Sequence, residues 1–329
     1  MSVMALSDDA WTIDPIAFPG SGTAREKLAF LARYAVLAPS GHVTQPWRFV
    51  VADNHVDVVA DLSRALRVVD PHYRDVTMSC ASAAETLLEA VRAYGYQGVL
   101  TPLPEPHAPT VIARVAIGAE ARRTMLDRDM LTAILRRRTE QRRYAQTQVP
   151  TALQTLMRET ARPYGVGLHL VSDVATKDKI ARLVVEADQI QFADPAFRAE
   201  FASLNSGTSG LSRMAAALFR VFDLGGNMDR SAAKDAPLLG VFTTKGDGHA
   251  DWVASGRAFA AVLHGVTMHG LANAVLNQPI EVEATRRVLG SVLGSSETPQ
   301  LLSRFGYLKE SVTLPRTDQR PRKEVLIAV

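Results

Sequence analysis

The chain has few cysteines, little net charge and no long apolar run, and each shortage excludes a class of protein. Cys80 is the only cysteine among 329 residues, so neither an intramolecular disulfide nor a cysteine-based zinc site can form. The net charge is +3 and the pI is near 9.1, a mild basic excess that does not predict nucleic-acid binding. No apolar run approaches the roughly 18–20 residues of a membrane-spanning helix, so we expect no membrane partner.

The first residues lack the features of a secretion signal. Residues 1–10 contain Asp8 and Asp9, with neither a basic start nor a long apolar segment. Hydrophobic residues make up 47% of the chain and charged residues 22%, which is typical of an ordinary soluble core. We therefore expect a cytoplasmic protein, long enough for one large α/β domain or two smaller ones.

The common nucleotide-binding and hydrolytic motifs are absent. The sequence contains no Gly-x-x-x-x-Gly-Lys-Ser/Thr loop, no Gly-x-Gly-x-x-Gly after a predicted strand, and no Gly-x-Ser-x-Gly. No histidine pair has the spacing of a helical zinc site, since His264 and His269 are five residues apart and diverge on a helix. We therefore predict no metal and no side chain acting as a nucleophile.

Elements of regular structure recur in a similar order in two parts of the chain. In the first part, the hydrophobic spacing predicts helices over residues 24–37 and 76–95, and strands over 47–52, 55–60 and 111–117. In the second part it predicts helices over 151–161, 177–188 and 252–270, and strands over 167–172, 236–244 and 301–307. Either the chain is a duplication, or it shows the alternation common to all α/β chains.

We expect an N-terminal arm over residues 1–24, a first half over 25–130 and a second half over 131–329. The second half carries an extra block near residues 192–234. Within it, a turn-rich run at 205–210 and an amphipathic helix at 211–222 suit a lid that closes over a ligand. A plain helical insertion at the surface is the alternative.

Residues 38–49 form the most informative segment, with the sequence APSGHVTQPWRF. A helix that ends in Pro39, Ser40 and Gly41 presents a hydroxyl and backbone N–H groups, which hold a polar ring edge or an anion. Pro46 is expected to place Gln45 in an extended conformation. Nothing in the segment resembles a nucleophile with its base.

Arginines concentrate at the junction of the two parts. Five of the eight residues 136–143 are arginines, and bidentate guanidinium bonds match the oxygens of a phosphate monoester. The alternative is a solvated basic turn that binds nothing. A second basic cluster contains Arg316, Arg320, Arg322 and Lys323; it either completes a phosphate clamp or is a frayed basic tail.

Asp70 and Arg74 precede the first long predicted helix. They either pair with each other or offer an acceptor and a donor to a heterocyclic ring.

Together these motifs resemble a known family. Residues 38–49 resemble the Ala-Pro-Ser-x-x-Asn-x-Gln-Pro-Trp signature of the FMN-dependent nitroreductase superfamily, and residues 137–139 resemble its Arg-Arg-Ser/Thr phosphate motif. Residues 252–271 and 302–307 are similar to its long central helix and its final strand. Because the Pro-Ser signature precedes the arginine motif here, the chain resembles the fused, pseudo-dimeric branch, the Acg-type FMN-binding proteins, over roughly residues 25–325.

The resemblance implies an α+β, nitroreductase-like fold. Two related halves, each with an antiparallel-type sheet flanked by helices, would form an internal pseudo-dimer with FMN between them. The residues that would bind FMN are Pro39, Ser40, Gly41, His42 and Gln45 at the ring and ribityl chain, Asp70 and Arg74 at the pyrimidine edge, and Arg137, Arg138, Thr139, Arg142, Arg316 and Arg320 at the phosphate.

Three positions depart from the family pattern. Val43 replaces the usual asparagine, and Gln141 replaces a basic residue, with Arg142 one position later. The lid block lacks the acidic-glycine turn that presents an N–H to the flavin, and residues 205–210 are the candidate replacement.

The resemblance implies an oxidoreductase in which NAD(P)H reduces FMN and a small acceptor, a nitroaromatic or a quinone, takes the electrons by a ping-pong scheme. The main alternative is a protein that sequesters or stores FMN with little turnover. A flavin-dependent dehydrogenase or oxidase and a flavin-free interaction module are further alternatives. We expect a monomer with an internal pseudo-dimer, or a homodimer.

Overall fold

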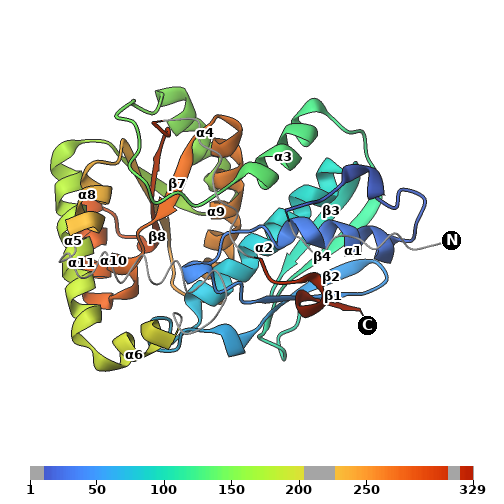
Figure 1. Cartoon of the computed structure of the whole chain (residues 1–329), viewed down its shortest axis with the longest axis horizontal. Helices are drawn as coiled ribbons and strands as arrows, with labels where there is room; N and C mark the ends of the chain where they lie inside the picture. Colours follow the sequence, from blue (N-terminus) through green and yellow to red (C-terminus); the bar gives the residue numbers. More distant parts are fainter. Residues whose placement is uncertain (1–10, 204–226, 310–318, 329) are drawn as a thin grey trace. The chain divides into compact units, whose positions relative to one another are not determined.

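A computed structural model describes residues 11–203, 227–309 and 319–328, and its contacts divide the chain into two units (Figure 1). The first unit contains the described residues up to Ala65, those from Asp75 to Arg136, and those from Gln319 onward. The second contains Leu66–Arg74 and the described residues from Arg137 onward up to the C-terminal tail. The predicted lid run at 205–222 and Arg316 lie outside the described residues.

The first unit is built on a five-stranded sheet with the order β3-β4-β2-β1-β9. Strand β9 pairs parallel with β1, whereas the other neighbours pair antiparallel. The elements are α1 (Ala24–Ala35), β1 (Trp47–Val51), β2 (His55–Ala60), α2 (Arg74–Ala93), β3 (Tyr96–Pro102), β4 (Val111–Glu120), α3 (Met125–Arg136), α12 (Arg322–Val325) and β9 (Leu326–Ala328), with short 3-10 turns at Pro15–Ala17, Gly41–Val43 and Leu62–Arg64.

Local chemistry fixes the start of this unit. Helix α1 begins with a capping box, in which the Thr23 hydroxyl accepts the Glu26 N–H at 3.2 Å and the Glu26 carboxylate accepts the Thr23 N–H at 2.7 Å. Strands β1 and β2 then form the predicted hairpin, with Trp47 opposite Ala60. Buried and partly exposed residues alternate along β2, as expected for a sheet with one covered face.

The second unit is built on a four-stranded antiparallel sheet with the order β5-β6-β8-β7. Its elements are α4 (Thr151–Ala161), a 3-10 turn (Arg162–Tyr164), β5 (Gly167–Val171), α5 (Val174–Ala193), α6 (Pro195–Ser203), α8 (Asn227–Lys234), β6 (Leu238–Thr244), α9 (His249–Met268), β7 (Ala272–Val275), α10 (Gln278–Glu281), α11 (Glu283–Leu293) and β8 (Thr298–Gly306).

Helices cover both faces of this second sheet. One core joins α4 and α9 to Leu238 and Phe242 of β6, and the other joins α5 and α11 to Leu239 and Val241 of the same strand. In Figure 1, α4 and α9 accordingly lie on one side of β8, and α5 and α11 on the other. Strand β6 is buried along its whole length, in keeping with the apolar run from Leu238 to Phe242.

The two sheets share one topology. Strands β3-β4-β2-β1 and β7-β8-β6-β5 follow the same order, with antiparallel pairing at every step. In each unit a 20-residue helix, α2 or α9, joins the second strand to the third. Each helix is followed by a glycine with positive φ, Gly95 at 86° and Gly270 at 76°. The α+β class and two related halves, each with a sheet flanked by helices, are confirmed; the parallel strand β9 was not predicted.

The units differ in the connections between matching strands. A turn at residues 52–54 joins β1 to β2, whereas α5, α6 and α8 lie between β5 and β6. A loop at 103–110 joins β3 to β4, whereas α10 and α11 lie between β7 and β8. The first insertion thus begins before the expected block at 192–234, and the second was not predicted. Among the residues that the structure describes, none of the helices has the length and apolar character to cross a membrane.

An aromatic cluster holds the start of the first unit together. The Phe18 ring lies 4.4 Å from that of Tyr94 and 5.5 Å from that of Phe30, measured between centroids. The hydroxyls of Tyr34 and Tyr94 lie 2.8 Å apart, and the Tyr34 side chain is fully buried. Burial raises the pKa of Tyr34 strongly, with a further rise from its bond to Tyr94, and burial also raises the pKa of Tyr94.

We predict that Tyr34→Phe lowers the free energy of unfolding by about 1–2 kcal/mol, because the buried Tyr94 hydroxyl loses its partner. Urea unfolding measures the change. Tyr96→Phe, at the margin of the same cluster, is the matched control and should change stability by less than about 0.5 kcal/mol. Equal losses of unfolding free energy in the two variants would show that the hydrogen bond between Tyr34 and Tyr94 does not add to stability.

The same pair predicts alkaline sensitivity. Above about pH 10 an unfolded tyrosine loses its proton, whereas Tyr34 in the folded chain keeps it, so stability should fall as pH rises. In Tyr34→Phe the slope of stability against pH above pH 10 should be smaller by about one proton per molecule. Denaturant titrations between pH 9 and 11 measure this slope. If the slope of the unfolding free energy against pH is the same in Tyr34→Phe and wild type, Tyr34 does not keep its proton in the folded chain.

Candidate functional site

The arginine-rich segment forms a loop pinned to the second sheet. Thr139 forms an isolated bridge with Asn273 of the edge strand β7, and the Glu140 N–H donates to the Asn273 carbonyl at 2.8 Å. Tyr144 forms a second bridge with Leu308, just beyond β8. The loop is therefore attached at both ends, although it contains neither helix nor strand.

Arg304 of β8 is the central anchor of this loop. The residue is 3% exposed, and its guanidinium donates to the carbonyl oxygens of Gln141 at 2.6 Å, Arg142 at 3.2 Å and Glu140 at 3.4 Å. It also lies 4.5 Å from the centroid of the Tyr144 ring, whose hydroxyl donates to the Glu140 carbonyl at 3.0 Å. Sequence reasoning placed Arg304 in the final strand but gave it no role. The available signal was an arginine within an apolar, buried strand.

The predicted phosphate residues open this loop. Arg137 is buried, Arg138 is partly buried and Thr139 is exposed. Burial, followed by the charge of Arg138, lowers the pKa of Arg137 to about 10. The guanidinium is still charged at neutral pH, but its charge is disfavoured, so an anion beside it would be stabilised. Arg138 donates from Nη1 to the Arg137 carbonyl at 2.7 Å, which orders the motif.

Arg142 and Arg320 already bind protein groups. Arg142 forms a bidentate pair with Glu140, with Nε–Oε1 at 3.0 Å and Nη2–Oε2 at 2.8 Å. Burial alone would raise the pKa of Glu140, but the bonds from Arg142 outweigh it and lower the pKa. In the first unit, Arg320 donates to the carbonyls of Gln45 at 3.1 Å and Trp47 at 3.0 Å, and lies 3.4 Å from Asp61. The tail from Gln319 is therefore not frayed within the described residues.

The Pro-Ser-Gly segment is a strained turn in the first unit. His42, Val43 and Gln45 have φ values of 48°, 55° and 47°, a left-handed region that costs free energy for such residues. The expectation of an extended Gln45 is thus wrong. Arg320 overrides the effect of Pro46, because it donates through its side chain to the Gln45 carbonyl and through its N–H to Gln45 Oε1 at 2.8 Å.

Two serines hold the same turn from inside. The Ser79 hydroxyl of α2 accepts the Gly41 N–H at 3.1 Å, and the Ser40 hydroxyl accepts the Gln45 N–H at 3.2 Å. A β-carbon at Gly41 would lie 3.4 Å from the Asp75 carboxylate, so the position is close-packed. Pro39 enters this turn in the first unit, and strain of this kind is concentrated at functional sites in proteins.

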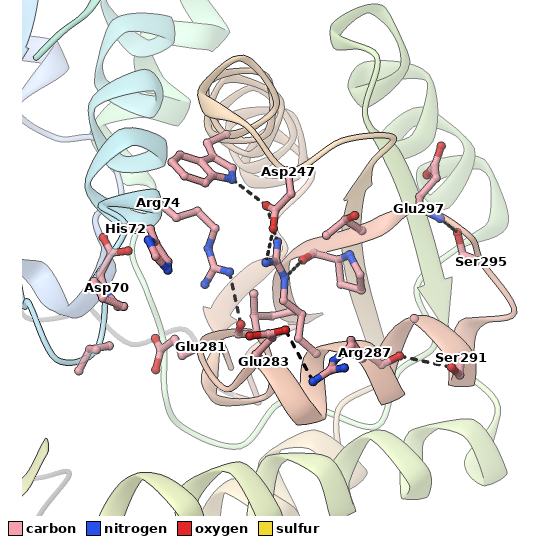
Figure 2. Close-up of a pocket in the computed structure, with 18 of the residues that line it drawn as sticks. Asp70, His72, Arg74, Asp247, Glu281, Glu283, Arg287, Ser291, Ser295 and Glu297 are labelled. Atoms are coloured by element: carbon pink, nitrogen blue, oxygen red, sulfur yellow. Dashed lines mark hydrogen bonds and ion pairs between the residues drawn. The ribbon is translucent and has the colours of Figure 1, made fainter. Parts of the chain in front are cut away.

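A cavity of about 560 Å³ lies within the second unit. Figure 2 shows Asp70, His72 and Arg74 on one wall, and Glu281, Glu283 and Arg287 on another. Asp70 and Arg74 are buried, with 6% and 9% exposure. Arg74 donates from Nη1 to the Ile280 carbonyl at 3.3 Å, which links the first wall to α10.

A polar network closes one end of the cavity. Asp247 accepts from Arg286 at 2.7 and 2.9 Å, from Trp252 Nε1 at 2.8 Å and from Gln300 at 3.1 Å. Burial would raise the pKa of Asp247, but these hydrogen bonds lower it to about 2. Arg286 also donates to the Pro299 carbonyl at 2.6 Å, so this network holds the loop before β8. Sequence reasoning missed Asp247, Arg286 and Glu281 as pocket residues.

The structure gathers the predicted residues into three groups. Each group lies within one unit: residues 39–45 with Arg320 in the first, and residues 137–142 and the pair Asp70 and Arg74 in the second. Their polar side chains are hydroxyls, guanidinium groups, amides, the His42 imidazole and the buried carboxylates of Asp70 and Glu140. They can bind and orient a polar ligand, and they contain no serine or cysteine nucleophile paired with a base.

Comparisons with known proteins support the resemblance along nearly the whole chain. The chain is 28% identical over 329 residues to "Putative NAD(P)H nitroreductase Rv3131" of Mycobacterium tuberculosis, covering 94% of this chain and 92% of that protein. It is 26% identical over 306 residues to "Putative NAD(P)H nitroreductase acg" of the same organism, covering 88% of this chain and 92% of that protein. No family model matches the chain.

A solved structure with a similar part is the FMN-dependent nitroreductase NfnB from Mycobacterium smegmatis in complex with NADPH. The match has 18% sequence identity and a TM-score of 0.43, and covers 59% of this chain and 96% of that one. At 94% and 88% of this chain, the alignments with the two mycobacterial proteins extend over both units. Over nearly its whole length the chain is therefore similar to proteins named putative NAD(P)H nitroreductases, one of them acg.

Proposed function

We propose that the protein is an FMN-dependent NAD(P)H oxidoreductase of the nitroreductase type. It takes electrons from a nicotinamide and passes them to a small acceptor, a nitroaromatic or a quinone, in a ping-pong sequence. The observation that carries this proposal is the loop at residues 137–142, which is preformed and anchored by Arg304. The names of the relatives, NAD(P)H nitroreductases, support the same reaction class and do not favour storage.

The donor set of the loop fits a phosphate monoester. Arg137 and Arg138 offer two guanidinium groups, and Thr139 offers a hydroxyl, in three consecutive residues. The lowered pKa of Arg137 indicates a charge that an anion would stabilise. Arg304 fixes the backbone of the same loop, so little ordering would be required on binding. Arg142 and Arg320 would support FMN binding indirectly, because Arg142 is paired with Glu140 and Arg320 is bound to the Gln45 carbonyl.

The cavity of the second unit fits the polar edge of a flavin ring. Its volume lies within the roughly 300–1,000 Å³ of small-molecule sites. Asp70 would accept a hydrogen bond from the ring, and the Arg74 guanidinium would stabilise negative charge on it. Bound FMN supplies the hydride chemistry that the side chains lack. Pro39, Ser40, Gly41, His42 and Gln45 remain predicted ring contacts.

Bound FMN would give the protein a characteristic absorbance. The purified protein should bind FMN one to one and absorb near 450 nm, and NADPH under anaerobic conditions should remove that absorbance. A protein that binds FMN but is not reduced by NADPH or NADH within minutes would favour storage. A colourless protein that does not bind added FMN would remove every flavin-based function.

A further prediction concerns the phosphate motif. Arg138→Ala should weaken FMN binding by about 1.5–3 kcal/mol, the range of a hydrogen bond to a charged group. Fluorescence titration of FMN into the apoprotein measures the change. Arg143→Ala, an exposed position in the same loop, is the matched control and should leave the affinity within about threefold. Equal affinity of Arg138→Ala and wild type would remove Arg138 from the site.

Another prediction concerns the anchor. Arg304→Lys should weaken FMN binding by roughly tenfold or more, because an ammonium group cannot span the three carbonyls and stack on Tyr144. Arg257→Lys, which alters a guanidinium 5.1 Å from the Tyr164 ring, is the matched control. Wild-type affinity in a folded Arg304→Lys protein would show that the loop does not depend on this arginine.

A further inference from the structure

The cavity wall that carries Asp70 and Arg74 has little regular structure of its own. Leu66–Arg74 contains turns until α2 begins, and Tyr73 has a φ of 59°. Two backbone hydrogen bonds, from Asp70 to Leu66 at 2.7 Å and from Tyr73 to Asp70 at 3.1 Å, close these turns. A segment of this kind takes its shape from whatever packs against it.

Glu200 of α6 holds this wall through its backbone. The carboxylate accepts the Val68 N–H at 3.1 and 3.0 Å, and the Val69 N–H at 3.0 Å. One charged group thus binds two consecutive peptides directly before Asp70, and such charge-assisted bonds are roughly twice as strong as neutral ones. Both partners belong to the second unit.

An apolar cluster supports the same attachment. Leu66 and Val69 of the wall pack with Phe197 and Phe201 of α6, and Phe192 packs against them. The rings of Phe197 and Phe201 are stacked with centroids 5.6 Å apart. The cluster keeps α6 beside the wall, while the carboxylate fixes the orientation of individual peptide groups.

The opposite wall is held from the same insertion. Gln191 of α5, 8% exposed, donates from Nε2 to the Glu281 carboxylate at 2.7 Å. Arg74 Nη1, bound to the Ile280 carbonyl, links the two walls directly. Helices α5 and α6 both lie in the β5–β6 connection, where the first unit has only a short turn between β1 and β2.

We propose that Glu200 and Gln191 are positioning residues of this cavity. Through them the insertion of the second unit sets the geometry in which Asp70, Arg74 and Glu281 meet a ligand. The insertion is thus a clamp on the pocket walls, and neither residue needs to touch the ligand. The identity of that ligand as FMN rests on the function proposed above, whereas the clamp itself does not.

Hydrogen–deuterium exchange with mass spectrometry tests the clamp in the full-length apoprotein. Glu200→Ala should speed exchange in peptides covering residues 66–74 by roughly tenfold or more, since two amides lose a charged acceptor. Glu200→Gln retains one acceptor oxygen and should give a smaller increase in the exchange rate. This variant replaces Glu200→Ala in the test if Glu200→Ala does not fold. Glu186→Ala, an exposed glutamate of α5, is the matched control.

Binding and kinetics complete the test. In Glu200→Ala and Gln191→Leu the Kd of FMN, or the KM of the acceptor menadione, should rise by roughly tenfold, with kcat reduced less than threefold. Unchanged exchange in residues 66–74, or faster exchange with unchanged Kd and KM, would overturn the proposal. A wild-type protein that binds no FMN but shows the exchange effect in Glu200→Ala would refute the flavin function and leave the clamp standing.

Discussion

The candidate phosphate site depends on the hydrogen bonds that the Arg304 guanidinium donates to the loop at residues 137–142. The guanidinium donates to three consecutive carbonyls of a loop that contains neither helix nor strand, and it lies over the Tyr144 ring near the end of that loop. A buried cation is costly unless its donors are bonded, so the loop and the arginine stabilise each other. The loop in turn presents Arg137, Arg138 and Thr139 without further ordering. The sheet strand β8 thereby determines the position of a motif more than 150 residues earlier in the chain.

Local patterns predicted much of the fold. Helix α4 begins and ends at the expected residues, and the β1–β2 hairpin, α2 and α9 lie where their periodicity placed them. Strand β9 was missed because its three residues pair in parallel with β1, a remote segment that no local pattern reveals. Helix α11 was missed although its apolar residues Val288, Leu289, Val292 and Leu293 recur at helical spacing. The sequence left open whether the two parts are related, and the matching strand orders show that they share one topology.

The sequence predicted which residue types belong to the candidate site, but it predicted the roles of individual residues less well. The arginine motif and the Pro-Ser-Gly turn were visible because short motifs carry their chemistry in sequence. The roles of Arg142 and Arg320 depend on partners, Glu140 and the Gln45 backbone, that only folding supplies. Gln45 shows the same limit, since a tertiary contact from Arg320 overrides the local preference set by Pro46. Asp247, Arg286 and Glu200 were not foreseen because each acts through a residue distant in sequence.

We expect the phosphate to be the main source of cofactor affinity, because the preformed loop offers its charged donors to that group. Riboflavin has the same ring and ribityl chain as FMN but lacks the phosphate, so parallel titrations of the two into the apoprotein isolate this contribution. FMN should bind at least roughly 100-fold more tightly than riboflavin, as two charge-assisted hydrogen bonds imply. Affinities for FMN and riboflavin within a factor of about three would contradict it.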